Sequence, residues 1–184
     1  MLPNFIFAFT PADMNTRRQA LAYATALSAS ALAPRWGLAN EQTAPPLPEV
    51  GEVFTLPSVE LLNGQMFTAQ PSQILVVYWW ASTCPFCALQ SPEMDKLYRR
   101  MAPQGMAFLG LSIDKTPQRA ADYLKLRGYT FPSAWVTPAF AQARPKPQGL
   151  PITVVRGANA QVLQAERGQL FPEDVADMAR WVKG

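Results

Sequence analysis

Continuous apolar runs and helical apolar spacings along the chain predict a mixed α/β domain. Two runs, residues 74–80 and 106–113, are apolar almost throughout, which is typical of strands buried on both faces of a sheet. Asn63-Gly64 predicts a tight turn near the N-terminal side of the first run. Shorter strand-like runs are expected at 52–56, 61–68, 131–136, 152–155 and 161–165.

Apolar residues at helical spacing predict three helices between and after these strands. The first covers 87–101, and we expect a kink at Pro92 because proline lacks an amide hydrogen. The second runs from Pro117 and stops at Gly128, and the third opens at Pro172. Residues 139–149 are expected to be irregular.

The order of these elements indicates the fold class. Strands alternate with helices, and the chain then finishes in a hairpin and a helix, which predicts an α/β sandwich with a mixed sheet. The 184 residues suffice for one ordinary domain. We assign this domain to residues 50–184 and a proline-rich, extended linker to residues 40–49.

The first 39 residues are interpreted as an export signal, outside the fold. Arg17-Arg18 precedes a moderately apolar stretch at 20–33, and residues 37–39 (Gly-Leu-Ala) give a small-x-small cleavage pattern. The paired arginines resemble a twin-arginine signal. Cleavage would leave a periplasmic protein without a membrane span, and an uncleaved anchor facing the periplasm is the alternative.

Charge and composition narrow the possible functions. The net charge is +3, but three arginines and one aspartate lie in the first 39 residues, so the rest of the chain is nearly neutral and nucleic acid is not an expected partner. The chain has no histidine, which excludes Ser-His and Cys-His couples and His-containing metal sites. Two cysteines cannot form an all-Cys metal cage, so no metal is expected. Thiol or carboxylate chemistry remains.

The two cysteines follow a buried strand and open the first predicted helix. Cys84 at the helix N-terminus would be favoured as a thiolate, which makes it the expected nucleophile. Cys87, three residues later, lies within disulfide reach on the same helical face and can resolve a mixed disulfide. Pro85 fixes one dihedral between them, and Phe86 offers an apolar contact to a client protein. A structural disulfide would add little stability in so short a loop, and a zinc half-site would need a second chain.

The sequence WASTCPFC at residues 80–87, followed by Pro92, resembles the active site of the thioredoxin superfamily. The wider pattern is most similar to the TlpA/ResA/CcmG branch of exported thioredoxin-like proteins, because an N-terminal hairpin and an extra helix and strand at about 115–137 are expected. The resemblance covers about residues 50–182. It implies a thioredoxin-like mixed-sheet sandwich with an N-terminal β-hairpin and an inserted helix–strand unit.

The resemblance also implies further site residues. Pro151 would be a cis-proline facing the disulfide, and Leu150 would offer backbone hydrogen bonds to an extended client; a trans proline that starts a strand is the alternative. Trp80 is expected to flank the active site and to contact the client. Arg144 and Lys146 could form a basic rim that selects an acidic client, or simply lie in a solvated loop.

Two positions depart from the pattern of this family. Gln90 stands where members of the branch often carry a glutamate, and Tyr78 stands where thioredoxin has a buried aspartate. The carboxylates that usually exchange protons with the buried thiol are therefore missing. Glu93 and Glu166 are candidates for a proton shuttle; a solvated surface position for Glu93 and an ion pair of Glu166 with Arg167 are the alternatives.

Three hypotheses follow. In the first, an exported thiol:disulfide oxidoreductase uses the redox-active disulfide Cys84–Cys87, without another cofactor, to reduce specific client proteins of the cytochrome c or copper-site maturation type, and an upstream thiol electron donor reduces it in turn. The second is an oxidant that introduces disulfides. The third is a non-catalytic client-binding or copper-holding module; the lack of histidine argues against a Cys-plus-His copper carrier. Antioxidant or peroxidase activity is not expected.

Overall fold

The computed structural model describes residues 44–182, which form a layered domain around a five-stranded mixed sheet. The expected export signal at 1–39 and residues 40–43 of the expected linker lie outside the described residues. Across the sheet the strand order is β5-β4-β3-β6-β7, with β3 parallel to β4, β4 parallel to β5, and β6 antiparallel to both β3 and β7. The strands are β3 (Leu75–Trp80), β4 (Ala107–Ser112), β5 (Ser133–Trp135), β6 (Ile152–Arg156) and β7 (Val162–Arg167).

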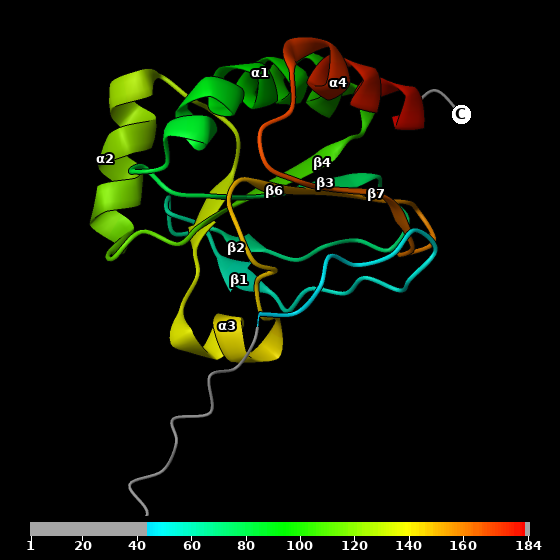
Figure 1. Cartoon of the computed structure of the whole chain (residues 1–184), viewed down its shortest axis with the longest axis horizontal. Coiled ribbons are helices and arrows are strands. Elements are labelled where there is room, and N and C mark those ends of the chain that lie inside the picture. The colour runs from blue at the N-terminus through cyan, green and yellow to red at the C-terminus, as the bar shows by residue number, and fades with distance from the viewer. Residues whose placement is uncertain (1–43, 183–184) are drawn as a thin grey trace, which may run out of the picture. The chain divides into compact units, whose positions relative to one another are not determined.

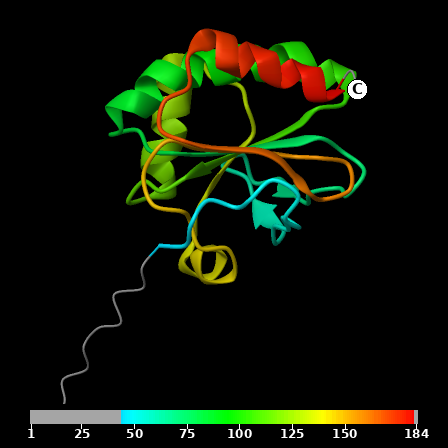
Figure 2. The same cartoon turned by 45° about the vertical axis from the view of Figure 1, so that its right-hand side comes forward.

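Helices cover both faces of this sheet. Figure 1 and Figure 2 show α1 and α4 together on one side, with α3 and the β1–β2 hairpin on the other. The helices are α1 (Pro85–Met101), α2 (Pro117–Arg127), α3 (Pro138–Ala143) and α4 (Pro172–Asp177), with 3₁₀ turns η1 (Ala102–Gln104) and η2 (Met178–Val182). The hairpin consists of β1 (Val59–Glu60) and β2 (Met66–Phe67). Among the helices of residues 44–182, none is long and apolar enough to cross a bilayer.

The central strand β3 separates two apolar cores. All six of its residues are buried, as its uninterrupted apolar sequence predicts. Alternate side chains point to opposite faces of a strand, so Tyr78 and Trp80 pack under α1 and α2, whereas Trp79 packs against Phe54 on the other face. The mixed sheet, the N-terminal hairpin and the inserted α2–β5 unit confirm the predicted fold class.

Local sequence signals account for the helix boundaries. Thr116 caps α2, because its side-chain oxygen accepts a hydrogen bond from the Arg119 amide at 3.3 Å, and Gly128 ends the helix in the left-handed region at φ 68°. The helix α1 is continuous across Pro92. The predicted second helix is confirmed from its first residue to its stop.

Three segments differ from the prediction. In the run expected as a strand at 61–68, only Met66–Phe67 is a strand, and it pairs with Val59–Glu60 across the turn at Asn63-Gly64. Residues 52–56 form no strand apart from one bridge between Val53 and Gln161. Their hydrogen bonds to the segment 160–162 are the Phe54 amide to the Ala160 carbonyl and the Val162 amide to the Glu52 carbonyl. The helix α3 occupies a segment expected to be irregular. Thr137 accepts a hydrogen bond from the Phe140 amide at 3.0 Å and caps α3 as Thr116 caps α2.

The proline-rich stretch is described from Ala44 onward. Residues 44–49 contain no helix or strand, yet Leu47 packs against the core on the α3 side of the sheet. This part of the expected linker therefore belongs to the domain, whose ordered packing begins earlier than residue 50.

Candidate dithiol active site

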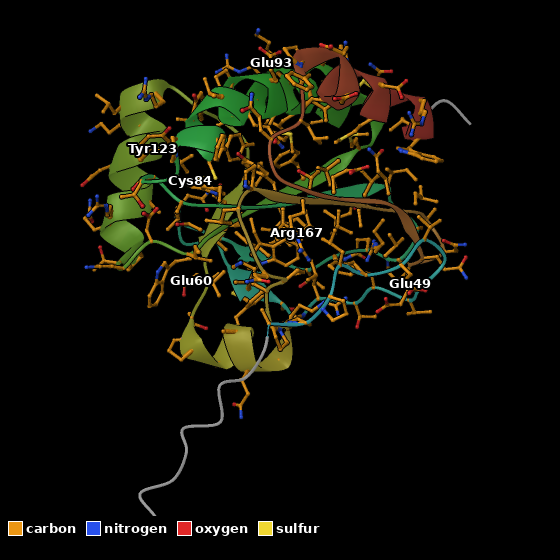
Figure 3. The ribbon with its side chains drawn as sticks, in the orientation of Figure 1. Glu49, Glu60, Cys84, Glu93, Tyr123 and Arg167 are labelled. Carbon is orange, nitrogen blue, oxygen red and sulfur yellow. The ribbon has the colours of Figure 1, made fainter. Side chains whose placement is uncertain are left out.

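The two cysteines lie where β3 passes into α1, and both are free thiols. Cys84 is the N-cap of α1, with an extended backbone (φ −85°, ψ 115°), and its sulfur accepts a hydrogen bond from the Cys87 amide at 3.2 Å. Figure 3 shows Cys84 at the beginning of the helix. Amide donors and the positive end of the helix dipole stabilise a negatively charged sulfur at this position.

Cys87 lies in a different environment one turn further on. Its side chain is only 1% exposed. Burial, followed by the hydrogen bond that its thiol makes to Cys84, raises the pKa of Cys87 well above its ordinary value, although hydrogen bonds involving Ala81 and Tyr78 lower it in part. Cys87 is therefore a neutral thiol at neutral pH, while the half-buried Cys84 faces the helix N-terminus. This difference suits a nucleophile and a resolving thiol in the predicted order.

The end of the neighbouring strand β4 holds the loop before Cys84. The buried Asp114 carboxylate accepts hydrogen bonds from the Ser82 amide (3.1 and 3.2 Å) and from the Ser82 hydroxyl (2.7 Å). Ser112 donates to the same carboxylate at 2.9 Å. Arg119 Nε donates to Ser82 Oγ at 3.2 Å, and Trp135 Nε1 donates to the Asp114 carbonyl at 2.7 Å. Three neighbouring elements thus fix the position of the loop that carries Cys84.

The loop before β6 reaches the same end of the sheet. The Leu150–Pro151 peptide bond is cis, as the resemblance implies. The next residue, Ile152, pairs with Trp79 near the end of β3, which places Pro151 beside the start of α1. Lys146 Nζ donates to the Gly149 carbonyl at 2.8 Å and secures this loop. The expected backbone contacts of Leu150 to a client stay a prediction.

The structure separates Arg144 and Lys146, for which a basic rim and a solvated loop were the two alternatives. The Arg144 guanidinium lies over the Phe54 ring, 3.9 Å from its centroid, in the core that Trp79 forms on the opposite face from the dithiol. Lys146 is half-buried, and burial followed by the charge of Arg167 lowers its pKa, while Cys87 raises it. Of the two cations, Lys146 lies within electrostatic reach of the dithiol, whereas Arg144 lies against the core on the other face of the sheet.

The expected client contact of Trp80 is also wrong. Its side chain is completely buried and packs against Tyr123 and Phe131, with ring centroids 5.6 and 6.4 Å apart. A strand that is covered on both faces leaves neither of two adjacent tryptophans at the surface. Phe86, in contrast, is 56% exposed between the two cysteines, beside exposed Pro85. These two residues are placed where a client could contact them.

The two candidate carboxylates lie apart from the thiols. Glu93 binds Lys96 through an ion pair of 2.7 Å, and Figure 3 shows it on the outer side of α1, away from Cys84. Glu166 on β7 is opposite Thr153, which is opposite Tyr78 in turn, so Glu166 shares the sheet face of the dithiol but is two strands from β3. The structure brings neither into the Cys84–Cys87 pair, and a proton-shuttle role for Glu166 stays a prediction.

Neutral groups occupy the two positions at which acids were expected. Gln90 is fully buried; its Nε2 donates to Thr153 Oγ1 at 3.0 Å and its Oε1 accepts from the Leu170 amide at 2.8 Å. It therefore connects α1 to β6 and to the segment before α4.

Tyr78 occupies the other of these positions. The Tyr78 hydroxyl lies 3.3 Å from the Cys87 carbonyl oxygen and 3.1 Å from Ser91 Oγ. The sequence marked Tyr78 only as the absence of an acid, and Ser91 was missed, although it stands one helical turn after Cys87 on the same face.

Ser82 and Asp114 were also missed as site residues. The available signal was an aspartate directly after a buried parallel strand, because the carboxyl ends of such strands meet at one edge of a sheet. In residues 44–182, no three His, Cys, Asp or Glu side chains gather as metal ligands.

Comparisons with known proteins agree with this fold. Residues 52–135 match the AhpC/TSA family, and no curated protein matches the chain. A crystal structure of a thiol:disulfide interchange protein DsbE from Chlorobium tepidum has a TM-score of 0.63 at 17% identity, covering 74% of this chain and 96% of that one.

Two further solved structures are similar. A thioredoxin family thiol:disulfide interchange protein from Chlorobium tepidum TLS has a TM-score of 0.60 at 24% identity, covering 76% of this chain and 96% of its own. A secreted disulfide oxidoreductase from Mycobacterium tuberculosis has a TM-score of 0.59 at 15% identity, covering 67% and 94%. The predicted thioredoxin-like fold is confirmed.

Proposed function

We propose that this thioredoxin-fold protein of the AhpC/TSA family is an exported thiol:disulfide oxidoreductase that exchanges disulfides with client proteins through Cys84 and Cys87. One observation carries the proposal: a half-buried thiol caps a helix, and a buried thiol of raised pKa follows it one turn later. The cis Leu150–Pro151 bond faces the same end of the sheet. The thiol:disulfide interchange proteins among its structural neighbours support the same activity.

The reduction of a client disulfide proceeds in two exchanges. The Cys84 thiolate attacks one client sulfur, the client S–S bond breaks, and the other client sulfur leaves as a thiolate. Cys87 then loses its proton and attacks Cys84 Sγ, so that the bond between Cys84 and the client breaks and the released client sulfur takes up a proton. The client gains two electrons, and an upstream thiol donor later reduces the Cys84–Cys87 disulfide.

The client surface lies around the nucleophile. Phe86 is 56% exposed and Leu89 is 61% exposed on the first turns of α1, which gives an apolar contact beside the reacting sulfur. The Leu150 backbone would bind an extended client segment next to it. We assign the clients to the cytochrome c or copper-site maturation type, in line with the sequence resemblance.

Export through the segment 1–39 completes the proposal. In the periplasm, a reduced dithiol needs a thiol donor because the compartment favours disulfides. The description of the Mycobacterium tuberculosis neighbour as secreted supports this location. We prefer cleavage and release over retention as a membrane anchor.

Trapping of the client tests the activity. In a Cys87→Ser variant, the mixed disulfide on Cys84 cannot be resolved, so clients should accumulate in a complex that a reductant releases. A Cys84→Ser, Cys87→Ser double variant is the matched control and should trap nothing. The proposal fails if the single variant traps no protein and the wild type exchanges no thiol with a model disulfide.

The reduction potential gives the direction of exchange. A value near that of thioredoxin, about −270 mV, indicates a reductant, whereas a value near about −120 mV indicates an oxidant. An inactive protein that binds Cu(I) through both thiols would instead support the copper-holding module.

The match to the AhpC/TSA family leaves peroxidase activity as a second activity to measure. In a peroxidase reaction, the Cys84 thiolate would be oxidised to a sulfenic acid and Cys87 would condense with it, giving the same disulfide and water. We expect exchange with disulfides to be much faster than consumption of hydrogen peroxide. The reverse ratio of rates in the same purified protein would favour peroxidase activity.

A further inference from the structure

We propose that the Tyr78 phenol, supported by the Ser91 hydroxyl, is the donor that stabilises the Cys87 thiolate while Cys87 resolves the mixed disulfide. It is a positioning residue, and this assignment rests on the proposed function. The pair would replace the carboxylate that the sequence lacks at positions 78 and 90.

The geometry of three buried groups supports this assignment. Tyr78 and Ser91 are completely buried, and Cys87 is 1% exposed. The phenol oxygen lies 3.3 Å from the Cys87 carbonyl oxygen and 3.1 Å from Ser91 Oγ. Tyr78 comes from the central strand, while Cys87 and Ser91 lie one turn apart on the helix above it. The Tyr78 hydroxyl therefore lies beside Cys87 within the core, and the Ser91 hydroxyl lies behind it.

A hydroxyl group can redirect its hydrogen without moving its oxygen. In the dithiol form the phenol donates to the Cys87 carbonyl. When Cys87 becomes a thiolate, the same hydrogen can turn to the sulfur, and Ser91 can donate to the phenol oxygen behind it. Hydrogen bonds to an ionised acceptor are about twice as strong as neutral ones, so this chain of donors favours the thiolate.

The charge state of Tyr78 defines its role as a donor. Burial raises the pKa of the Tyr78 phenol well above its ordinary value, so the group stays protonated and does not act as a base. Its hydrogen bond lowers the pKa of Cys87, opposing the larger effect of burial. The Cys87 proton therefore leaves toward the departing client sulfur, while the phenol keeps its own proton throughout the exchange.

The exchange of the reduced, full-length protein with one equivalent of the chromogenic disulfide DTNB separates the two thiols. In the first phase Cys84 attacks DTNB, which releases one coloured thiolate (TNB) and leaves the other half of DTNB disulfide-bonded to Cys84. In the second phase Cys87 attacks Cys84 Sγ and releases the second TNB. We expect Tyr78→Phe to slow the second phase about tenfold at neutral pH, to shift its pH profile to higher pH, and to leave the first phase unchanged. Ser91→Ala should slow the second phase by a smaller factor.

Tyr98→Phe is the matched control. It also removes a phenol oxygen, from a tyrosine packed against Phe108 in the same core, and it should leave both phases unchanged. The assignment is overturned if the rate of the second phase in Tyr78→Phe stays within about twofold of the wild-type rate, a factor that corresponds to the weakest net hydrogen bonds. It is also overturned if Tyr98→Phe slows the second phase as much as Tyr78→Phe does.

The phases also separate this assignment from the proposed function. If the wild-type protein shows no first phase, both the proposed function and the role of Tyr78 are refuted. If wild type and Tyr78→Phe both show a normal first phase and the same second phase, only the role of Tyr78 is refuted. If Tyr78→Phe does not fold, Ser91→Ala decides: a second phase at the wild-type rate over the whole pH range refutes the assignment, and a slower one supports it.

Discussion

The Asp114 carboxylate accepts hydrogen bonds from the amide and the hydroxyl of Ser82, at 3.1 and 2.7 Å. It thus connects the end of β4 to the residue two positions before Cys84. Asp114 is 6% exposed. Since a buried ionised acceptor strengthens its hydrogen bonds, this contact fixes the approach of the chain to the dithiol more firmly than a neutral pair would.

We expect Asp114→Ala to lower the free energy of unfolding by about 2–4 kcal/mol, because the Ser82 amide and the Ser112 hydroxyl lose their acceptor. The DTNB first phase should also slow, since the loop that carries Cys84 is no longer held. Denaturant unfolding and stopped-flow absorbance measure the two effects.

Asp122→Ala is the control for this prediction, because Asp122 is exposed on α2 and accepts only from Gln118. It should change the stability by less than about 0.5 kcal/mol. Equal losses in the two variants would refute the special role of Asp114.

Gly110 on β4 leaves room for Trp80. A Cβ at this position would collide with Ser133 Oγ and would lie 3.0 Å from Phe131 Cε2 and 3.1 Å from Trp80 Nε1. We expect Gly110→Ala to lower the free energy of unfolding by about 3 kcal/mol through overpacking. In a double-mutant cycle, adding Ser133→Ala to Gly110→Ala should restore part of the lost stability. If the changes in the free energy of unfolding of the two single variants simply add in the double variant, the Ser133 contact is not responsible.

The buried thiol makes the stability of the reduced protein sensitive to alkaline pH. The folded-state pKa of Cys87 exceeds its ordinary value of 9.0, so above pH 9 the unfolded chain loses this proton while the folded chain keeps it. Stability present below pH 9 is therefore lost as the pH rises, by up to about 1.4 kcal/mol per pH unit. Cys87→Ala should lack this component. Parallel stability curves of the two reduced proteins from pH 8 to 10.5 would contradict the prediction.

Gln90→Glu tests why a neutral amide occupies this position. A carboxylate there would be buried, and its oxygen could not donate to Thr153 as the amide does. Burial should raise the folded-state pKa of the new carboxyl above its unfolded value of about 4.3, so the variant loses stability as the pH rises from about 4 to 8, by about 3 kcal/mol. Gln90→Met should lower the free energy of unfolding by a similar amount at every pH. A loss of stability in Gln90→Glu that does not depend on pH would show that the buried carboxyl forms hydrogen bonds that compensate its charge.

Local patterns allowed the central part of the site to be predicted from the sequence. The apolar run before Cys84 predicted the strand, and the Cys84–Cys87 spacing predicted one thiol at the helix N-terminus and a second thiol one turn later. The pair Thr137-Pro138 carries the same start signal as Thr116-Pro117, but the prolines and cations that follow outweighed it, and α3 was missed.

The burial of the tryptophans and the side-chain pairs around the dithiol depend on tertiary contacts, which the spacing of apolar residues along the sequence does not reveal. A continuous apolar strand does not tell which of Trp79 and Trp80 reaches the surface, and the structure buries both. Ser91 lies 13 residues from Tyr78, and Asp114 lies 32 residues from Ser82. Such pairs follow from the sheet order and the helix placement, which a single sequence leaves open.

The opposite directions of β3 and β6 have a consequence for how the site is built. Five residue pairs along these strands set where Pro151 emerges, so the sheet itself, and not the length of the peptide between α3 and Pro151, determines where the cis bond lies relative to the dithiol.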